Sequence, residues 1–456
     1  MKLIDELYVL PDGRQFILYA PLKRTILVAN RSLLSLLARI RAGLDLPRDA
    51  ESTRWIRELE RLGLINSVES LPPTMNSPDE AYAPTNVTFL PTSDCNLRCV
   101  YCYADSGTTK KYLSADIAKA GLDLVFENAA RKRASKVHVG FLGGGEPFLA
   151  WDFVVEVVDY GRGLADRLGI EAYFTGVTNG VLSTARAQWI TRNFQYLNIS
   201  IDGTKAIQDE HRPAKGGKGS YDAVVGTVRI MNDAGFRYAL RTTVSSRSVS
   251  ELPAITEFFS KELKAPRIQF EPLFACGRCK TQKDLAPDPA SFVEGFKKAL
   301  AVVDPTKTEV LCSVLRVDVL SPTFCGALAD NFYITPDAHV TSCTEVSSVD
   351  DPLAKVFFIG KYESGRGFIF FQDRRDVLQS RTVGNLKQCK CCIAKWHCAG
   401  GCAVKAAHEG DLYATAAVAN CKIARELTEN SVRTLARGQR MSPRIEVESI
   451  RWAERR

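Results

Sequence analysis

Three cysteines stand close together in Cys95-Asn-Leu-Arg-Cys99-Val-Tyr-Cys102. A tight loop can bring three such thiolates to one side, where they can bind three corners of a cubane iron-sulfur cluster and leave the fourth iron open. Zinc is the alternative, but a structural zinc site needs four ligands, usually from paired Cys-x2-Cys turns, and no histidine or fourth cysteine lies nearby in the sequence. The spacing therefore predicts an iron-sulfur loop with one free coordination site.

The loop resembles the signature of the radical S-adenosylmethionine (SAM) enzymes, in which an aromatic residue, here Tyr101, precedes the last cysteine. The resemblance implies that Cys95, Cys99 and Cys102 bind a 4Fe-4S cluster and that SAM chelates the open iron. One electron from the cluster would cleave SAM to a 5'-deoxyadenosyl radical, which abstracts hydrogen from an unactivated carbon. The protein would position this radical and exclude water.

A glycine-rich run, Gly143-Gly-Gly-Glu-Pro147, follows a predicted strand downstream of the cysteine loop. Glycines let a backbone approach a ligand closely, and a carboxylate can accept hydrogen bonds from an ammonium group. The run resembles the SAM-amino motif of the same family, and an ordinary glycine-rich turn is the alternative. SAM contacts are therefore predicted for Gly143, Gly144, Gly145 and Glu146.

Small polar residues follow the next two predicted strands, in Thr178-Asn-Gly180 and Ser200-Ile-Asp-Gly203. They suit a ribose or a carboxylate and resemble family usage, although each pattern is also common turn chemistry. His211 is interpreted as a loop histidine, and Arg241 as either a carboxylate binder or an internal salt-bridge partner. No catalytic acid or base can be assigned. SAM contacts are predicted for Asn179, Ser200, Asp202 and Arg212.

A second group of cysteines follows the pattern Cys325-x17-Cys343 and then Cys389-x2-Cys392-x5-Cys398-x3-Cys402-x18-Cys421. These seven positions resemble the SPASM domain of radical SAM peptide and protein maturases, which holds two auxiliary 4Fe-4S clusters. A zinc ribbon does not easily use so many thiolates with such mixed spacing. The resemblance implies an outer cluster on Cys389, Cys392, Cys398 and Cys421, and an inner cluster on Cys325, Cys343 and Cys402 with Cys312 as the candidate fourth ligand. Some members of the family leave that iron open for substrate.

Two positions depart from the SPASM pattern. Ala338 stands where the pattern has glycine, so we expect a turn without positive φ there. Cys343 is followed by Thr344 and Glu345, whereas sulfatase-maturing relatives carry an Asp directly after that cysteine as a base. Formylglycine formation is therefore the less expected chemistry.

Three further cysteines fall outside these patterns. Cys276-Gly-Arg-Cys279 is a redox pair, a source of extra cluster ligands or simply two thiols on a loop. Cys391, inside the outer-cluster motif, is interpreted as a non-ligand.

The elements that must carry these motifs form an α/β protein. Strand-like runs at 87–90, 137–142, 172–178, 197–201, 239–244 and 268–273 alternate with helical patterns at 114–130, 152–168, 184–193, 222–234, 252–263 and 290–303. Such repeats build a parallel sheet with its active residues at the carboxyl ends of the strands. The resemblance implies a partial (β/α)6 radical SAM barrel over residues 86–303, followed by a SPASM domain over 304–425.

The first 70 residues are expected to form a separate α+β unit. Runs at 6–10, 15–19 and 24–28 suggest a three-stranded meander, and apolar residues at helical spacing predict two helices after it. This order resembles the winged-helix element with which peptide-modifying enzymes hold a leader peptide, added as an extra strand to a sheet edge. A structural cap is the alternative. Residues 71–85 are predicted to be a linker, and residues 426–456 a C-terminal helix and basic tail.

Composition limits the remaining choices. The 456 residues are 45% apolar and 25% charged, as in soluble globular proteins of several domains. No signal peptide or membrane span is predicted, so we expect a cytoplasmic protein, in which fourteen cysteines favour cluster ligation over disulfides. The net charge of +8 is not gathered into blocks, so no nucleic-acid partner is expected.

Together these features predict a radical SAM maturase with three 4Fe-4S clusters. Its partners would be a ribosomally made precursor peptide with a leader sequence and an electron donor such as flavodoxin or ferredoxin. The expected reaction ends in a carbon-carbon, ether or thioether crosslink within the peptide. Two-electron oxidation of a protein side chain, as in sulfatase maturation, is the alternative enzyme hypothesis. An iron-sulfur electron-transfer or scaffold protein is the non-enzymatic one, but it leaves the glycine motif and the open coordination site unexplained.

Overall fold

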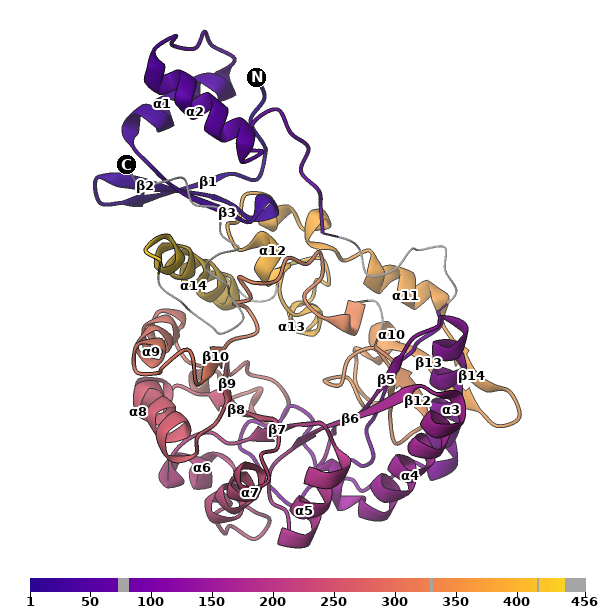
Figure 1. The fold of residues 1–456 in the computed structure, drawn as a ribbon. Coiled ribbons are helices and arrows are strands. Elements are labelled where there is room, and N and C mark those ends of the chain that lie inside the picture. The colour runs from indigo at the N-terminus through magenta and orange to yellow at the C-terminus, as the bar shows by residue number, and fades with distance from the viewer. Residues whose placement is uncertain (73–81, 329–330, 416–417, 439–456) are drawn as a thin grey trace.

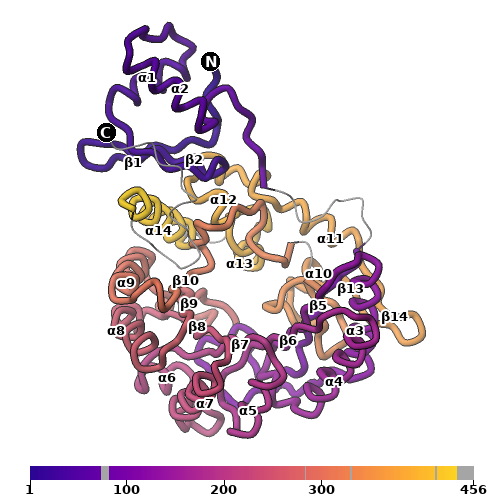
Figure 2. Tube along the Cα trace, in the orientation of Figure 1, coloured from indigo at the N-terminus to yellow at the C-terminus, as the bar shows by residue number. Residues whose placement is uncertain are grey.

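The computed structural model describes residues 1–72, 82–328, 331–415 and 418–438 (Figure 1). Most of the predicted linker 71–85 and the tail beyond residue 438 lie outside these ranges. The chain trace in Figure 2 shows a curved α/β body, a smaller unit at the N-terminal end, and the last helix lying between them. Among the described residues, no helix combines the length and the apolarity needed to cross a membrane.

Six parallel strands form the centre of the curved body. They pair in chain order, with β4 to β9 hydrogen-bonded side by side, which confirms the predicted strand-helix alternation. The strands are β4 (Val87–Phe89), β5 (Lys136–Phe141), β6 (Glu171–Thr178), β7 (Tyr196–Ser200), β8 (Tyr238–Val244) and β9 (Arg267–Pro272).

Helices cover the convex side of this sheet (Figure 1). They are α3 (Ala115–Arg131), α4 (Trp151–Leu168), α5 (Thr184–Asn193), α6 (Lys205–His211), α7 (Tyr221–Asp233), α8 (Leu252–Glu257) and α9 (Pro289–Ala301). The short α6 was not predicted, and the predicted helix 252–263 continues after α8 only as a π-helical turn, Phe258–Glu262. The helices and the sheet share one apolar core.

Alternation along the strands separates this core from the concave side. In β7, the side chains of Leu197 and Ile199 are fully buried in the core. Ser200, the last residue of the strand, points to the opposite face, which is the concave side. In α4, Val154, Val157 and later apolar residues repeat at helical spacing and face the same core. The sequence therefore directs apolar side chains outward under the helices and polar strand ends inward.

The sheet continues beyond the predicted six strands on both edges. β10 (Glu309–Leu311) pairs with β9, and on the other edge β11 (Tyr333–Ile334) pairs in parallel with β4 and in antiparallel with β12 (His339–Thr341). β13 (Phe358–Glu363) and β14 (Gly367–Phe370) complete eleven strands. Residues 304–425, the cysteine-rich half, are thus joined to the barrel by hydrogen-bonded strands at both edges of one sheet.

The turn between β11 and β12 corrects one expectation. Ala338 adopts φ +59°, so the residue takes the left-handed conformation that glycine normally supplies and our prediction of a turn without positive φ was wrong. Its backbone N–H donates to the Thr335 carbonyl oxygen at 2.9 Å, which closes the turn. The hairpin geometry is kept although the residue type is not.

The rest of the cysteine-rich half consists of short helices and loops. The helices are α10 (Ala354–Phe357), α11 (Gln372–Gln379), α12 (Lys395–Cys398), α13 (Ala403–His408) and the long α14 (Val418–Ala436). The C-terminal helix therefore begins before residue 426, where the predicted C-terminal helix and tail start.

The N-terminal unit contains the predicted antiparallel meander of β1 (Tyr8–Asp12), β2 (Gln15–Ala20) and β3 (Thr25–Ala29), followed by α1 (Arg31–Ala42) and α2 (Ala50–Arg61). Both helices begin at capping residues. The side chains of Asn30 and Asp49 accept hydrogen bonds from backbone N–H groups in the first turns of α1 and α2.

Both faces of this small sheet are buried. Leu18 and Ala20 pack under α1 and α2, whereas Ile17 and Tyr19, one residue out of phase, pack against Ile393 and the end of α14. The N-terminal unit is therefore seated on the cysteine-rich half as well as on its own helices (Figure 1).

Candidate functional site

The cysteine loop leaves the carboxyl end of β4 and is held by its own backbone. Arg98 donates to the carbonyl oxygen of Cys95 at 3.1 Å, which keeps the loop tight. The backbone N–H of Leu97 points at Cys95 Sγ at 3.4 Å, and that of Ser106 at Cys102 Sγ at 3.5 Å. N–H groups aimed at sulfur stabilise a thiolate, which is the form that ligates iron.

The glycine motif docks directly on the cysteine loop. Glu146 donates its backbone N–H to the Asp94 carbonyl oxygen at 2.9 Å, and the Tyr103 hydroxyl donates to the Gly143 carbonyl oxygen at 2.8 Å. A Cβ on Gly145 would lie 2.0 Å from the same Asp94 oxygen. Glycine at position 145 is therefore required by close backbone approach.

The Glu146 side chain is buried and joins the ends of two strands. Its carboxylate accepts the Thr178 hydroxyl at 2.8 Å, the Asn179 backbone N–H at 2.7 Å and the Phe148 backbone N–H at 3.3 Å. A carboxylate has about four acceptor sites, so one remains for a further donor. Burial raises the pKa of Glu146 to about 7, against the opposing effect of these donors.

These motifs converge on a cavity of about 380 Å³ at the concave side of the barrel. Its volume falls in the range of small-molecule sites, about 300–1,000 Å³. The predicted residues that line it are Cys95, Cys99, Tyr101, Cys102, Gly143, Gly144, Gly145, Glu146, Asn179, Ser200, Arg212 and Cys402. Other lining residues include Tyr103, Arg241, Gln269, Glu271, Cys276, Glu345 and Lys405, most of which sequence reasoning had not connected to the site.

Asp202 is fully buried and does not line the cavity. It accepts the Tyr101 hydroxyl and the Thr243 backbone N–H, the latter at 3.1 Å, and its Oδ2 lies 3.2 Å from Nε of Arg212. Burial alone would raise the pKa of Asp202, but the Arg212 guanidinium leads the groups that hold it below its usual range. Asp202 thus supports two lining residues from behind.

His211 is part of this support and not a loop residue as predicted. It ends α6, is 1% exposed, and places Nδ1 3.4 Å from Asp202 while Nε2 lies 3.1 Å from the Ser245 hydroxyl. Its carbonyl oxygen also accepts the Val100 backbone N–H at 2.9 Å, so it braces the cysteine loop. Arg241 makes no ion pair within the described residues and faces the cavity.

The Cys276–Cys279 segment clamps the same loop. The guanidinium of Arg278 donates to the Cys99 carbonyl oxygen at 2.7 Å, and its backbone N–H donates to the Cys102 carbonyl oxygen at 2.9 Å. Cys276 lines the cavity, whereas Cys279 is fully buried against Tyr101. Cys276 and Cys279 therefore face different surroundings, and their role as a redox pair, extra cluster ligands or two loop thiols stays a prediction.

The inner group of cysteines lies beside this cavity. Burial raises the pKa of Cys343, and the charged neighbours that add to this effect are Glu345, Cys402 and Cys325. Burial likewise raises the pKa of Cys402 to about 11. Cys312, 2% exposed, is absent from the cavity wall, and its acidic and thiol neighbours are Glu271 and Cys398.

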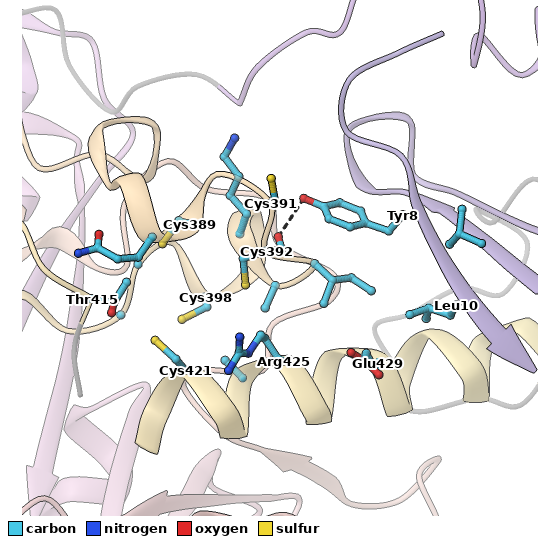
Figure 3. A pocket seen from close by; sticks show the side chains of 18 residues that line it. Tyr8, Leu10, Cys389, Cys391, Cys392, Cys398, Thr415, Cys421, Arg425 and Glu429 are labelled. Carbon is cyan, nitrogen blue, oxygen red and sulfur yellow. Dashed lines mark hydrogen bonds between the residues drawn. The ribbon is translucent and has the colours of Figure 1, made fainter. Parts of the chain in front are cut away.

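The outer group lines a second cavity, of about 560 Å³, under β1 (Figure 3). Burial is the main cause that raises the pKa of these thiols, and the charges of the neighbouring thiols raise it further, to about 11 at Cys389 and about 12 at Cys398. Tyr8 from the N-terminal unit donates to the Cys392 carbonyl oxygen at 2.9 Å, and Cys391 is exposed on the Tyr8 side. The four predicted ligands in this wall are Cys389, Cys392, Cys398 and Cys421.

The residues of all three groups fit iron-sulfur clusters. All fourteen cysteines are free thiols. Backbone N–H groups two or three residues downstream are directed at the sulfurs of Cys325, Cys343, Cys392 and Cys402 as they are in the first loop. Within the described ranges no three His, Cys, Asp or Glu side chains gather closely enough for a single metal ion. A cubane places each thiolate on a different iron, so its ligands lie farther apart.

Comparison with known families identifies the barrel. The sequence profile of the radical SAM superfamily matches residues 89–257. These residues are a radical SAM domain. The matched range contains the cysteine loop, the glycine motif and Arg212, so the radical SAM resemblance and the α/β fold class are confirmed. The match ends before the second group of cysteines.

Several curated relatives are enzymes that share this domain. The chain is 28% identical to a cysteine-type anaerobic sulfatase-maturating enzyme of Clostridium novyi, over 37% of this chain and 46% of the relative. It is 31% identical to the mycofactocin maturase MftC of Mycolicibacterium smegmatis, over 41% and 45%. An AdoMet-dependent heme synthase of Methanosarcina barkeri is 28% identical over 45% and 55%. The chain thus spans about half the length of the curated relatives that it matches.

Solved structures extend the similarity of fold beyond the radical SAM domain. The structure of anSMEcpe with bound AdoMet superimposes with a TM-score of 0.63 at 17% identity, over 77% of this chain and 95% of that chain. Streptococcus suis SuiB bound to its precursor peptide SuiA gives 0.55 at 14% identity, over 92% and 99%. The fold of both the barrel and the flanking parts is therefore shared with these two proteins.

Proposed function

We propose that this chain is a radical SAM maturase that forms an intramolecular crosslink in a ribosomally synthesised precursor peptide. The observation that carries the proposal is the single cavity whose wall contains the first cysteine loop, the glycine motif and Cys402 of the inner group. A substrate carbon held there could face the radical on one side and an electron acceptor on the other. The resemblance to peptide and protein maturases adds support.

The residues of the cavity are assigned roles as follows. Cys95, Cys99 and Cys102 would hold the first 4Fe-4S cluster, and Glu146, with its one free acceptor site, would accept the ammonium group of SAM. Arg212 and Ser200 would bind its carboxylate, because a guanidinium and a hydroxyl are donors suited to that group. Bound SAM and its cluster supply a carbon-centred radical after one-electron reduction by a flavodoxin or ferredoxin.

The cysteine-rich half, residues 304–425, is proposed to hold the two auxiliary clusters on its inner and outer groups. Removing a second electron from the substrate is their proposed task. Closing a crosslink removes two electrons and two protons in total, and the radical takes the first of each as one hydrogen atom. The barrel, residues 86–303, binds SAM in this scheme.

The N-terminal unit, residues 1–70, is proposed to bind the leader. Its sheet leaves β1 and β3 at the edges, and β1 carries Pro11, which lacks an N–H, and contacts the outer cysteine cavity. The β3 edge is therefore the better place for an added peptide strand.

The competing function is two-electron oxidation of a protein side chain. It is favoured by the similarity to sulfatase-maturating enzymes, whereas Thr344, directly after Cys343, lacks the carboxylate that those relatives use. Both functions remove two hydrogens, so mass alone does not distinguish them.

Tandem mass spectrometry separates the two. A short open reading frame beside the gene is co-expressed with the enzyme, and the peptide product is compared with the unmodified peptide. A crosslink makes the peptide about two daltons lighter and prevents fragmentation between the joined residues. A peptide of the same mass that fragments at every bond and reacts with a hydrazine carries a carbonyl, and this result would reject the crosslink.

A further inference from the structure

Glu345 lies on a tight turn that begins at an inner cysteine. The Val346 backbone N–H donates to the Cys343 carbonyl oxygen at 3.1 Å, and the backbone N–H of Glu345 is directed at the Cys343 sulfur. The half-buried side chain of Glu345 extends into the wall of the SAM-side cavity. The turn therefore fixes this carboxylate close to one of the predicted ligands of the inner cluster.

The carboxylate of Glu345 has no hydrogen bond or ion pair to any described residue, unlike the other acids of the cavity. Glu146 accepts three donors, and Glu271 accepts the backbone N–H and hydroxyl of Ser313 at 2.9 and 2.7 Å. A half-buried carboxylate without a protein partner keeps its acceptor sites available for a group bound in the cavity. Its position therefore points to a group that is absent from the protein chain itself.

Glu345 lies close enough to all three inner cysteines for its charge to act on them. Burial is the main cause that raises the pKa of Cys343 and of Cys402, and the charge of Glu345 is the next largest. Glu345 also raises the pKa of Cys325. Cys312, the candidate fourth ligand of the sequence analysis, lies by Glu271 and Cys398. The inner group thus consists of three thiols and one carboxylate.

We propose that Glu345 binds the fourth iron of the inner cluster through a carboxylate oxygen, completing a set with Cys325, Cys343 and Cys402. The inference rests on the inner cluster of the proposed function. One iron-oxygen coordinate bond forms as the carboxylate displaces a solvent molecule from that iron, and no electron is transferred. Oxygen is a harder ligand than thiolate, so this corner is held less tightly than the other three and can be exchanged for a thiol.

Mössbauer spectroscopy tests the assignment on iron-57-reconstituted protein. The parent protein is the full chain with C95A, C99A and C102A, which removes the first cluster and leaves about eight irons in two cubanes. Into this parent are introduced E345Q, E345C, C312A and, as a matched control on the same segment, D350N. Iron content and circular dichroism are recorded for each protein.

The parent and D350N should show about one iron in eight with oxygen ligation. This component should be lost in E345Q, become thiolate-like in E345C, and stay unchanged in C312A. Adding 2-mercaptoethanol should convert it to a thiolate-like signal in the parent and have no effect on E345C. If E345Q takes up less iron, full uptake by E345C still supports the assignment, because a thiolate replaces the carboxylate.

Three results would overturn it. An oxygen-ligated component that persists in E345Q excludes Glu345 as its source. The parent protein could instead bind eight irons with thiolate ligation alone and lose inner-cluster iron when C312A is introduced. Cys312 would then be the fourth ligand, and the proposed function would stand. A parent with only about four irons has no inner cluster, and that part of the proposed function fails together with the assignment.

Discussion

Replacing Asp202 by Asn should strongly destabilise the radical SAM domain. The change keeps the shape of the side chain but removes the negative charge that lies 3.2 Å from Nε of Arg212. The Arg212 side chain is only 11% exposed, so its guanidinium would be left without a counter-charge in the protein interior. The Tyr101 hydroxyl would also face an amide that competes as a donor.

The expected magnitude follows from this burial. Removing one partner of a buried ion pair costs about 3–5 kcal/mol, because the remaining charge is uncompensated. For a domain of about 200 residues each kcal/mol lowers Tm by about 2–4 °C, so D202N should lower the Tm of the barrel by roughly 6–20 °C. The matched control is D222N, whose carboxylate is 82% exposed and paired with Lys205. It should cost less than about 1 kcal/mol.

The assay is thermal unfolding of anaerobically reconstituted protein, with the double variant D202N/R212M alongside the singles. Removing both charges together should restore about 2 kcal/mol relative to the sum of the single losses. Because the pKa of Asp202 is held below its usual value, the pair contributes stability above pH of about 4 and loses it as pH falls through the lower folded pKa. The difference in Tm between wild type and D202N should therefore become smaller only at acidic pH.

Two results would refute this reasoning. A Tm for D202N within the range of D222N would mean that Arg212 is adequately solvated by the cavity. Additive losses in the double variant would mean that the two side chains act independently.

Three other variants test the site. Replacing Cys95, Cys99 and Cys102 by Ala should remove about four of about twelve irons and abolish SAM cleavage, measured by iron analysis and a deoxyadenosine assay; zinc without iron-dependent absorbance would contradict the cluster assignment. As the pH falls below about 7, Glu146 becomes protonated and the SAM affinity of the wild type should decrease by up to about tenfold per pH unit, relative to that of E146Q. Calorimetry measures both affinities across this pH range. The same pH dependence in wild type and E146Q would contradict this role of Glu146. E6Q breaks the ion pair that joins the N-terminal unit to Lys395. It should raise protease sensitivity near β1 without changing uncoupled SAM cleavage. An unchanged digestion pattern would show that apolar packing alone holds the N-terminal unit in place.

Local sequence patterns were sufficient to predict the barrel. The six strands and most helices were predicted because apolar residues repeat at strand or helix spacing, as in β7 and α4. The cysteine loop and the glycine motif were found because close backbone approach restricts residue type, as the contact of Gly145 with Asp94 explains.

Contacts made by residues far apart in the sequence were not predictable in this way. Nothing local in the sequence indicated that Asp202 lies behind Tyr101, or that Glu345 reaches the same cavity as the first cysteine loop. The pairing of β11 with β4 was missed because β11 has only two residues and no periodicity. Ala338 was misjudged because the fold imposes the left-handed conformation on a residue that does not favour it locally.

The β4–β11 pairing also has a consequence for synthesis of the protein in cells. Roughly 240 residues separate the two strands, so at about 5–20 residues per second the edge of β4 waits roughly 10–50 s for its partner to leave the ribosome. The second face of the N-terminal sheet waits longer still, for α14. An open strand edge and an uncovered apolar face favour association with other nascent chains, so production of this protein should depend on chaperones more than its final packing suggests.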